Sequence, residues 1–500
     1  MGISFNAASL LNGNGIDVSS IVSEIQAGQS GQVTAWQADQ ATLQKQATTI
    51  TNIGTDLSAL QTAVQALADP TGVLTGLTAT SSVSAVLTAT VQAGATAGSY
   101  NVVVSSLATT GTLYTASIAN ATTSVLPTGQ TTGDLQIQIG GSGGTTADIA
   151  ITAGTNDTLT TLANSINTQS TANNWGITAN VVTDASGSRL AIYSQASGSP
   201  GALAVGGSNT TNLTFEPPVG GTDSLFTVNG IPYSTTTNTV TQAIPDLTLN
   251  LESADSGLPV QVTVGPNTTG ITSAVTNFVN AYNTVVSDIN SQFAYNTSTN
   301  SQGTLGSDNS LRILQSSLLA DVAYSTTDAT SVSSGLNNLA ALGIDVNDDG
   351  TLTINPVATD THPAFSNELA SNPAGVQNFF QNSSLTGFAN TFNTDLSNLS
   401  APATGVLSED LAANQSQQSD LTTEITNFQT QLAAQQAQLE LVFNAVNASL
   451  EQYPFTLLEI QTALGSITST GANTTPTTPT STNTTPTSGN ATTSGTTTSS

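Results

Sequence analysis

The 500-residue sequence predicts an α+β multidomain protein in which paired terminal coiled-coil helices carry antiparallel β-rich head domains. Three observations predict this class. Apolar residues recur at heptad spacing near both ends of the chain, alternate with polar residues between about 98 and 265, and return to helical spacing over 271–293. At roughly 100 to 200 residues per domain, the length predicts three or four domains.

A long helix is predicted over residues 16–68. Its apolar positions recur every seven residues, with a second set three residues later: Trp36, Leu43, Ile50, Leu57 and Val64, then Ile53, Leu60 and Leu67. So narrow a stripe is typical of a coiled-coil seam rather than of a broad amphipathic face. Asp69-Pro70 ends the helix, because the residue before a proline disfavours the helical conformation.

A second heptad helix is predicted near the other end. Its seam positions alternate spacings of four and three residues and are apolar except for one glutamine: Leu421, Ile425, Phe428, Leu432, Gln435, Leu439, Val442 and Val446. Tyr453-Pro454 is expected to kink or interrupt this helix, after which an apolar stripe resumes at Leu457. The two helices most simply pair with each other, antiparallel; the alternative is two independent core helices.

Between these helices a period of two predicts half-buried antiparallel strands. They centre on 100–104, 135–139, 247–251 and 260–264, and Asn229-Gly230 is a hairpin-turn signal. Helices are predicted at about 157–168, 271–293 and 308–320, the last with Asp308 as its N-cap. The Thr/Ser/Pro-rich tail, 468–500, is predicted to be disordered, because it has too few apolar side chains to form a core.

The composition excludes several kinds of function. Three Lys and Arg residues against 31 Asp and Glu give a net charge of −28, so nucleic acid and anionic membrane surfaces are poor partners. The absence of cysteine excludes disulfides and thiolate chemistry, and the single histidine excludes any site that needs two imidazoles. No apolar stretch is long enough to span a membrane and no cleaved signal peptide is recognised, so we expect export by another route.

The charge also predicts a pH response. Because few carboxylates can find a cationic partner, mutual repulsion is expected to raise their pKa values, so that the protein tolerates mild acid and salt strengthens its assembly.

Three motifs resemble functional sites, but each is better interpreted as an ordinary turn or loop. Residues 140–144 match G-x-S-x-G, yet strand alternation follows, which indicates a glycine hairpin loop. Residues 345–350 match the first half of a calcium loop, but Pro356 stands where the closing glutamate is needed, which favours a β-hairpin turn. His362 is interpreted as a solvated loop residue. We therefore expect a protein that is not an enzyme, with no catalytic residue, metal or cofactor.

A series of short motifs resembles, in order, those of the bacterial flagellar filament-capping family, flagellar hook-associated protein 2 (FliD). The motifs lie at 15–22, 98–104, 162–167, 188–192, 226–230, 244–249, 278–283, 305–308 and 342–350. The motif at 162–167 also resembles a repeat found in the heads of flagellin. None is specific alone, but their order over residues 15–467 is.

The resemblance implies a structural cap at the distal end of the flagellar filament. Such caps are rings of about four to six subunits that retain exported flagellin and promote its folding and polymerisation. The implied partners are other copies of the chain, flagellin, hook-associated junction proteins and a flagellar type III export chaperone, and the implied location is extracellular, at the flagellar tip. The alternatives are a flagellin-like or hook-junction subunit and a secreted surface adhesin.

The patterns and the resemblance divide the chain into five parts. They are terminal leg helices (1–40 and 406–467), a helical domain with a small β-hairpin (41–78 and 269–405), a β-rich head domain (79–110 and 222–268), an inserted α+β outer head domain (111–221) and the tail (468–500). The residues expected to contact other subunits and flagellin are seam positions: Trp36, Leu43, Ile50, Leu57, Leu60, Val64, Leu421, Ile425, Phe428, Leu432, Leu439, Val442 and Val446.

Overall fold

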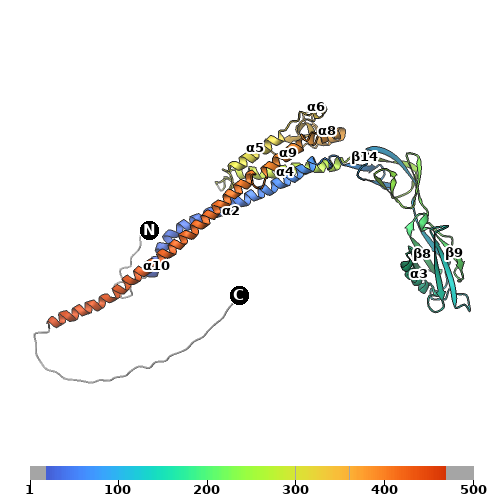
Figure 1. Cartoon of the computed structure of the whole chain (residues 1–500), viewed down its shortest axis with the longest axis horizontal. Coiled ribbons are helices and arrows are strands. Elements are labelled where there is room, and N and C mark those ends of the chain that lie inside the picture. The colour runs from blue at the N-terminus through green and yellow to red at the C-terminus, as the bar shows by residue number, and fades with distance from the viewer. Residues whose placement is uncertain (1–17, 299, 360, 469–500) are drawn as a thin grey trace, which may run out of the picture. The chain divides into compact units, whose positions relative to one another are not determined.

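A computed structural model of the chain describes residues 18–298, 300–359 and 361–468 (Figure 1). Its residues fall into two compact units. The terminal unit comprises 1–45 and 414–500, and the main unit is Gln46–Ala413. Helices and antiparallel sheets are both present, which confirms the α+β class. The predicted disordered tail, from residue 469 onward, and the first three residues of the 15–22 motif lie outside the described residues.

Two long helices contribute to both units: α2 (Val18–Ala68) and α10 (Val406–Thr468). As predicted, α2 ends just before Asp69-Pro70, where Asp69 Oδ1 accepts a hydrogen bond from the Thr71 N–H at 2.9 Å. Of the predicted kink or interruption at Tyr453-Pro454, the interruption is wrong, because α10 continues through both residues. A proline costs a helix about 3 kcal/mol through one missing N–H and one clash, and the long hydrogen-bonded runs on either side outweigh that local cost.

The second half of α2 lies in the largest core, within the main unit. It packs there with an antiparallel hairpin and a set of helices: β15 (Ile344–Val346), β16 (Leu352–Ile354), α4 (Thr268–Phe293), α5 (Asn309–Val322), α6 (Ala329–Ser334), η2 (Ala340–Leu342), α7 (Phe365–Ser371), α8 (Pro373–Phe380) and α9 (Phe388–Leu399). The predicted cap is present, since Asp308 Oδ1 accepts from the Ser310 N–H at 2.6 Å.

Aromatic side chains hold this core together. The Phe388 ring lies 5.6 Å from that of Phe278, 5.5 Å from Phe379 and 5.5 Å from Phe392, centroid to centroid. All four side chains are buried. The sequence analysis predicted α4 but not α7, α8 or α9, because those helices are too short to show a clear period.

A second core lies between two antiparallel sheets. One sheet has the order β1-β14-β3-β10-β11 and the other β12-β13-β2. Their strands are β1 (Leu77–Ser81), β2 (Leu87–Val91), β3 (Gly98–Ser106), β10 (Ser224–Val228), β11 (Ile231–Thr235), β12 (Thr239–Ile244), β13 (Leu247–Leu251) and β14 (Asp255–Pro266). Asn229 and Gly230 join β10 to β11 with φ of 51° and 83°, which confirms the predicted hairpin turn.

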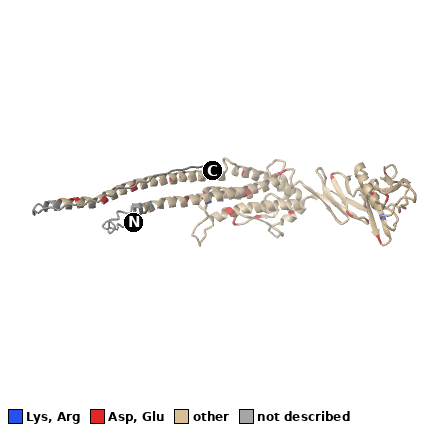
Figure 2. Ribbon diagram, turned by 90° about the horizontal axis from the view of Figure 1, so that it is seen from below, with Lys and Arg blue, Asp and Glu red and all other residues tan. Residues whose placement is uncertain are grey.

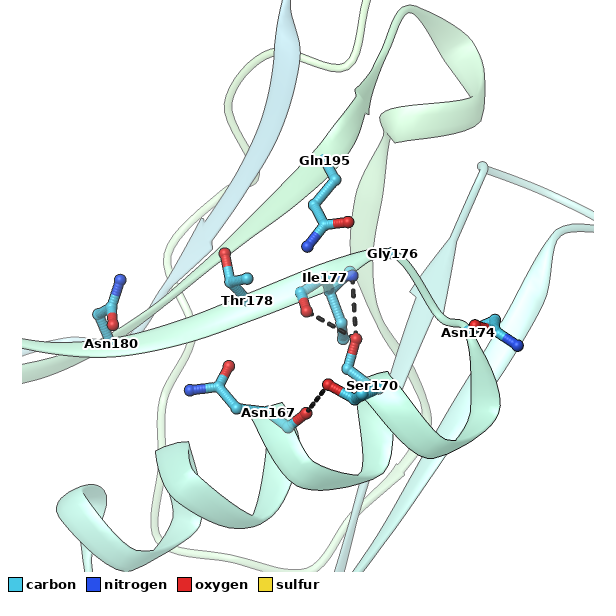
Figure 3. A pocket seen from close by; sticks show the side chains of 9 residues that line it. Asn167, Ser170, Asn174, Gly176, Ile177, Thr178, Asn180 and Gln195 are labelled. Atoms are coloured by element: carbon cyan, nitrogen blue, oxygen red, sulfur yellow. Dashed lines mark hydrogen bonds between the residues drawn. The ribbon is translucent and has the colours of Figure 1, made fainter. Parts of the chain in front are cut away.

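A third core belongs to residues inserted between β3 and β10. It combines the sheets β4-β8-β7 and β6-β5-β9 with helix α3 (Leu159–Asn173). The strands are β4 (Thr110–Tyr114), β5 (Thr132–Ile139), β6 (Thr145–Thr152), β7 (Ile177–Asp184), β8 (Gly187–Ser197) and β9 (Leu203–Asn209), and η1 is Ser199–Gly201. The glycine segment 140–144 joins β5 to β6, as predicted. Side chains of α3 bind the backbone of β7 (Figure 3).

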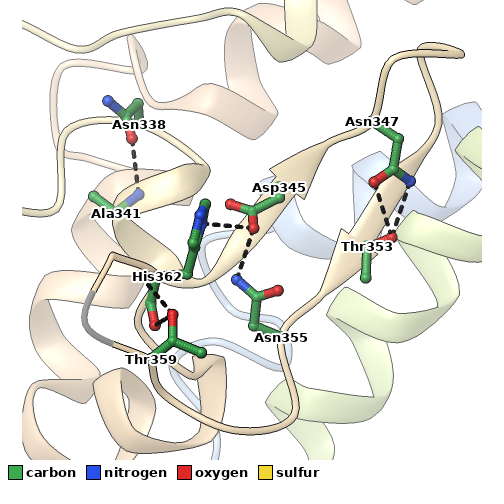
Figure 4. A network of polar contacts seen from close by, with 8 residues as sticks. All are labelled: Asn338, Ala341, Asp345, Asn347, Thr353, Asn355, Thr359 and His362. Carbon is green, nitrogen blue, oxygen red and sulfur yellow. Dashed lines mark hydrogen bonds and ion pairs between the residues drawn. The ribbon is translucent and has the colours of Figure 1, made fainter.

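The calcium-like motif forms the turn between β15 and β16, which confirms the hairpin prediction. His362 is an exposed loop residue, as interpreted from the sequence, and its Nδ1 also lies 2.8 Å from Asp345 Oδ2 (Figure 4). The same carboxylate oxygen accepts from Asn355 Nδ2 at 3.0 Å, so the imidazole ties its loop to the hairpin. Among the described residues, no group of three or more His, Cys, Asp or Glu side chains could hold a metal ion. No helix within them is both long and apolar enough to cross a membrane.

The pKa values of the carboxyl groups shift in opposite directions in two kinds of surroundings: burial beside another carboxyl group, and hydrogen bonding to N–H or hydroxyl groups. Acidic positions are spread over helices and sheets, and basic positions are rare (Figure 2). Burial and a neighbouring carboxyl, Asp395, raise the pKa of Asp321 to about 8; burial and Asp308 raise that of Asp410 to about 6. Elsewhere hydrogen bonds lower the pKa, as the Ser331 N–H does for Asp328. The prediction that repulsion raises carboxylate pKa values is therefore wrong for carboxylates that N–H and hydroxyl groups stabilise.

Candidate interaction surface on the terminal helices

The two long helices pair inside the terminal unit. Val33 of α2 is buried with Ile425 and Leu432 of α10. The Trp36 and Phe428 rings meet edge to face, with centroids 5.3 Å apart and planes at 83°. Gln40 Nε2 donates to Thr422 Oγ1 at 2.8 Å. Because the partner's number falls along α10 as it rises along α2, the pair is antiparallel, as predicted.

The apolar contact in this pair is thin. Its buried cluster contains three side chains, with Trp36, Leu421 and Phe428 half-buried around it. Beside it lies a groove of about 480 Å³. Its α10 wall is Gln429 and Leu432, and its α2 wall is Ser23, Ala27, Ser30, Val33, Thr34 and Gln37. Small side chains on α2 leave this space, so the two helices by themselves do not fill their own seam.

Within the part of the chain that the structure describes, the last part of α10 has no such cover. At the observed register, Val18 lies opposite about residue 445, because both helices rise about 1.5 Å per residue. Beyond that point many of the large apolar side chains of α10 are exposed to solvent, by 41 to 73 %: Val446, Tyr453, Phe455, Leu457, Leu458, Ile460 and Leu464. We call these seven residues the apolar tip. An apolar set of this size is typical of a surface that another protein covers.

The negative charge of the terminal unit repels another acidic helix, such as that of a second copy of the chain. The described parts of the terminal unit contain seven carboxylates and one lysine: Glu24, Asp39, Asp420, Glu424, Glu440, Glu451 and Glu459, against Lys45. Apolar burial must therefore supply the attraction in any assembly, and salt should strengthen that assembly by screening the repulsion.

The structure divides the thirteen predicted contact residues into three groups. Trp36, Leu421, Ile425, Phe428 and Leu432 meet in the pair described above. Leu43 and Leu439 are half-buried, whereas Val442 and Val446 are exposed.

The third group corrects the predicted seam. Ile50, Leu57, Leu60 and Val64 are at most 3 % exposed, within the main unit's own core. Their neighbours include α4 and α9, so the heptad stripe is not one continuous coiled coil. A side chain buried this deeply has no surface to offer a partner.

Sequence reasoning missed part of the surface. Val22 and Val33 are buried although neither was assigned to the seam. Continuing the seven-residue spacing backward from Trp36 would have reached Val22, whereas Val33 falls in neither of the two predicted sets. Tyr453-Pro454 was predicted to kink or interrupt the helix and the apolar stripe to resume only at Leu457, so Tyr453 and Phe455 were not assigned to it, although α10 is continuous there.

Two family models match the chain. The model of the flagellar hook-associated protein 2 N-terminus matches residues 14–111, and that of the C-terminus matches residues 221–454. The chain belongs to the flagellar hook-associated protein 2 family. The unmatched interval contains most of the residues inserted between β3 and β10, and α10 beyond residue 454 also lies outside the match.

The relatives in this family differ in how much of their length aligns with this chain. The B-type flagellar hook-associated protein 2 of Pseudomonas aeruginosa is 28% identical over 324 residues, which cover 59% of this chain and 65% of that protein. Flagellar hook-associated protein 2 of Helicobacter pylori is 28% identical over 163 residues, and that of Campylobacter jejuni is 28% identical over 166. The chain thus aligns with less than two thirds of the first relative and with 22% and 24% of the other two.

Solved structures of the family are also similar. The D1-D2-D3 domains of the flagellar cap protein FliD from Escherichia coli cover 73% of this chain and 99% of that one, at 24% identity and a TM-score of 0.48. FliD (HAP2) of Pseudomonas aeruginosa covers 42% of this chain and 98% of that one, at 26% identity and a TM-score of 0.34.

Proposed function

We propose that this protein is a structural subunit of the cap at the distal end of the bacterial flagellar filament. In this role several copies form a closed ring that retains exported flagellin and promotes its folding and polymerisation, outside the cell at the growing tip. The work is binding and guidance without covalent chemistry. Family membership supports the proposal, and so does the apolar tip of α10, which needs a protein partner.

The terminal helices are the proposed legs. Their mutual contact is thin, and the described residues leave both the groove along α2 and the apolar tip unfilled on this helix pair. A second copy of the chain and flagellin are the proposed occupants, with hook-associated junction proteins as neighbours in the filament. Before assembly, an export chaperone is the proposed cover, because a helix with so many exposed apolar groups is prone to aggregate.

The domain boundaries predicted from the sequence stay part of this proposal. The proposed legs are residues 1–40 and 406–467, the helical domain is 41–78 and 269–405, and the heads are 79–110 with 222–268 and the inserted 111–221. Residues 468–500 remain a separate tail. The rival function is a flagellin-like subunit. Such a subunit polymerises through head-to-tail contacts that do not close, so it gives open helical filaments where a cap gives closed rings.

The test is Leu432→Asp combined with Leu439→Asp. Both changes place a carboxylate in the helix pair, where it would lose solvation, so ring formation and filament growth should be lost while the main unit stays folded. Ala433→Asp with Gln438→Asp is the matched control, because it adds the same charge to the same helix at exposed positions.

Electron microscopy of the purified chains and filament length in cells that lack their own cap protein are the two measurements. Normal rings and filaments from the Leu432/Leu439 variant would contradict the proposed legs. Open filaments from the unaltered chain would favour the flagellin-like subunit instead.

A further inference from the structure

Strand β7 forms an edge of the sheet β4-β8-β7. In an antiparallel pair a residue directs its N–H and C=O to the same side of the strand. Gln195 donates its N–H to the Gly176 carbonyl at 2.8 Å, on the side of β8. The alternation of the ladder therefore turns the backbone groups of Ile177 and Ala179 away from β8, toward the open edge.

Two side chains of α3 bind all four of these backbone groups, and Figure 3 shows the bonds between Ser170 and Ile177. Ser170 Oγ accepts from the Ile177 N–H at 3.2 Å and donates to the Ile177 carbonyl at 2.6 Å. Asn167 Oδ1 accepts from the Ala179 N–H at 2.7 Å, and its Nδ2 donates to the Ala179 carbonyl at 2.8 Å. Each side chain thus offers one donor and one acceptor, the same pair that a residue of a neighbouring strand would offer.

The geometry explains why this pair of residues can replace a strand. Asn167 and Ser170 are three positions apart on the helix, a rise of about 4.5 Å, whereas Ala179 and Ile177 are about 6.8 Å apart along the strand. The asparagine side chain, which is longer than that of serine, spans the difference between the helix spacing and the strand spacing. Ser170 is 6 % exposed, and asparagine and serine are poor choices for the middle of a helix, so local helix stability does not account for them.

The polar groove of about 610 Å³ beside α3 follows from this arrangement. It is lined by Asn174, Thr178, Asn180 and Gln195 together with Asn167 and Ser170, and none of its lining side chains is charged. Asn167 also ends the 162–167 motif, for which neither the fold nor the proposed function gave a reason.

We propose that Asn167 and Ser170 act as a surrogate strand that closes the first part of the edge of β7, residues 177–179, and prevents this part of the head from pairing, edge to edge, with a second copy of the chain. An open edge presents unpaired N–H and C=O groups that template a further strand. This inference rests on the proposed ring, in which several heads meet at high local concentration. At such a concentration an open β7 edge would pair with that of a neighbouring copy.

The experiment compares three full-length variants. Asn167→Ala with Ser170→Ala frees all four edge groups, and Asn167→Ala alone frees only those of Ala179. Thr168→Ala with Thr171→Ala is the control, because these threonines lie on the same helix and each donates only to a carbonyl of its own helix. Circular dichroism verifies that each variant is folded.

Two measurements are needed together. Hydrogen–deuterium exchange of the peptide over 176–184 in dilute solution should speed up about tenfold or more in the double variant, less in the single variant and not in the control. Sedimentation at rising concentration should show association in the double variant beyond whatever the unaltered chain shows.

Faster exchange together with this added association supports the proposal. Unchanged exchange, or faster exchange without added association, overturns it. If the double variant does not fold, the single variant decides by the same two criteria. Ring formation by the unaltered chain and by the control is read separately, so failure of the proposed cap function would not be mistaken for failure of the surrogate strand.

Discussion

The two halves of α2 share one apolar pattern and have different surroundings. From Ile50 to Leu67 the isoleucine, leucine and valine side chains are at most 3 % exposed, in a core shared with α4, α5, α8 and α9. In the terminal unit the same helix offers Val33 and a half-exposed Trp36 to a single partner, α10. A heptad stripe therefore predicts which face of a helix is buried. It does not predict which elements bury that face or how completely they do so.

This contrast assigns different tasks to the two halves. A fully buried stripe stabilises the folded chain, whereas a stripe with a groove and an uncovered continuation is suited to binding. The predictions below test that division, from the largest expected effect to the smallest.

The largest difference is expected between Leu60→Ala and Leu432→Ala. Leu60 is fully buried in the main core, so its truncation should lower the free energy of unfolding by about 2 to 5 kcal/mol through lost transfer energy and a new cavity. Leu432 has few apolar neighbours, so the loss should stay below about 1 kcal/mol. Chemical denaturation followed by circular dichroism measures both, and equal losses would refute the division.

The buried carboxylates give the next effect. Asp321 has its pKa raised to about 8, so over the range from about pH 4 to pH 8 the folded state keeps a proton that the unfolded state has lost. This contribution to stability is present at low pH and disappears as pH rises through the folded pKa. One retained proton gives a slope of about 1.4 kcal/mol per pH unit, and solvent reaching this partly exposed group makes the slope smaller.

Asp321→Asn keeps a hydrogen-bond donor without a charge. It should therefore raise stability relative to the unaltered chain near pH 8 and change it little near pH 5. Asp410→Asn is the comparison, because the pKa of Asp410 is raised only to about 6 and its effect should be complete by about pH 7. Urea unfolding at pH 5, 6, 7 and 8 measures both; identical profiles for the two variants would contradict the assigned causes.

Salt should act on the terminal unit in the opposite sense to an ion-pair contact. The described parts of this unit carry seven carboxylates against one lysine. Raising the ionic strength from low to about 0.5 M at pH 7 should therefore favour association of the legs, since charge repulsion then falls off over only a few ångströms. Sedimentation velocity at several salt concentrations provides the measurement. Dissociation on adding salt would mean that specific ion pairs hold the assembly.

The smallest effect on stability is expected at the apolar tip. Leu458→Ser with Leu457→Ser should change the unfolding free energy by less than about 0.5 kcal/mol, because both side chains are already more than half exposed. Assembly should nevertheless weaken, since the tip loses apolar surface for its partner. A stability loss comparable to that of Leu60→Ala would show that the tip belongs to the core.

Several elements could be predicted because their causes are local. The alternation around Val102 and Leu249, the Asn229-Gly230 turn, the Asp308 cap and the stop at Asp69-Pro70 each depend on a few neighbouring residues. The position of the predicted helix pair could also be read from heptads, since Ile425 and Leu432 fall at the spacing that a partner helix requires. The short helices α7 to α9 could not, because their apolar residues cover barely two or three turns.

The sequence by itself determined the periodicities, the turns, the caps, the scarcity of positive charge and the order of family motifs, since each is a property of residues close together in the chain or of the composition. Only the tertiary structure decided that Leu60 is core while Leu458 is exposed, that His362 meets Asp345, and that Asn167 and Ser170 close the edge of β7. These facts depend on which distant segments meet. The burial of a side chain, the pKa of a carboxyl group and the protection of a strand edge all depend on contacts between distant segments, and no local sequence pattern encodes those contacts.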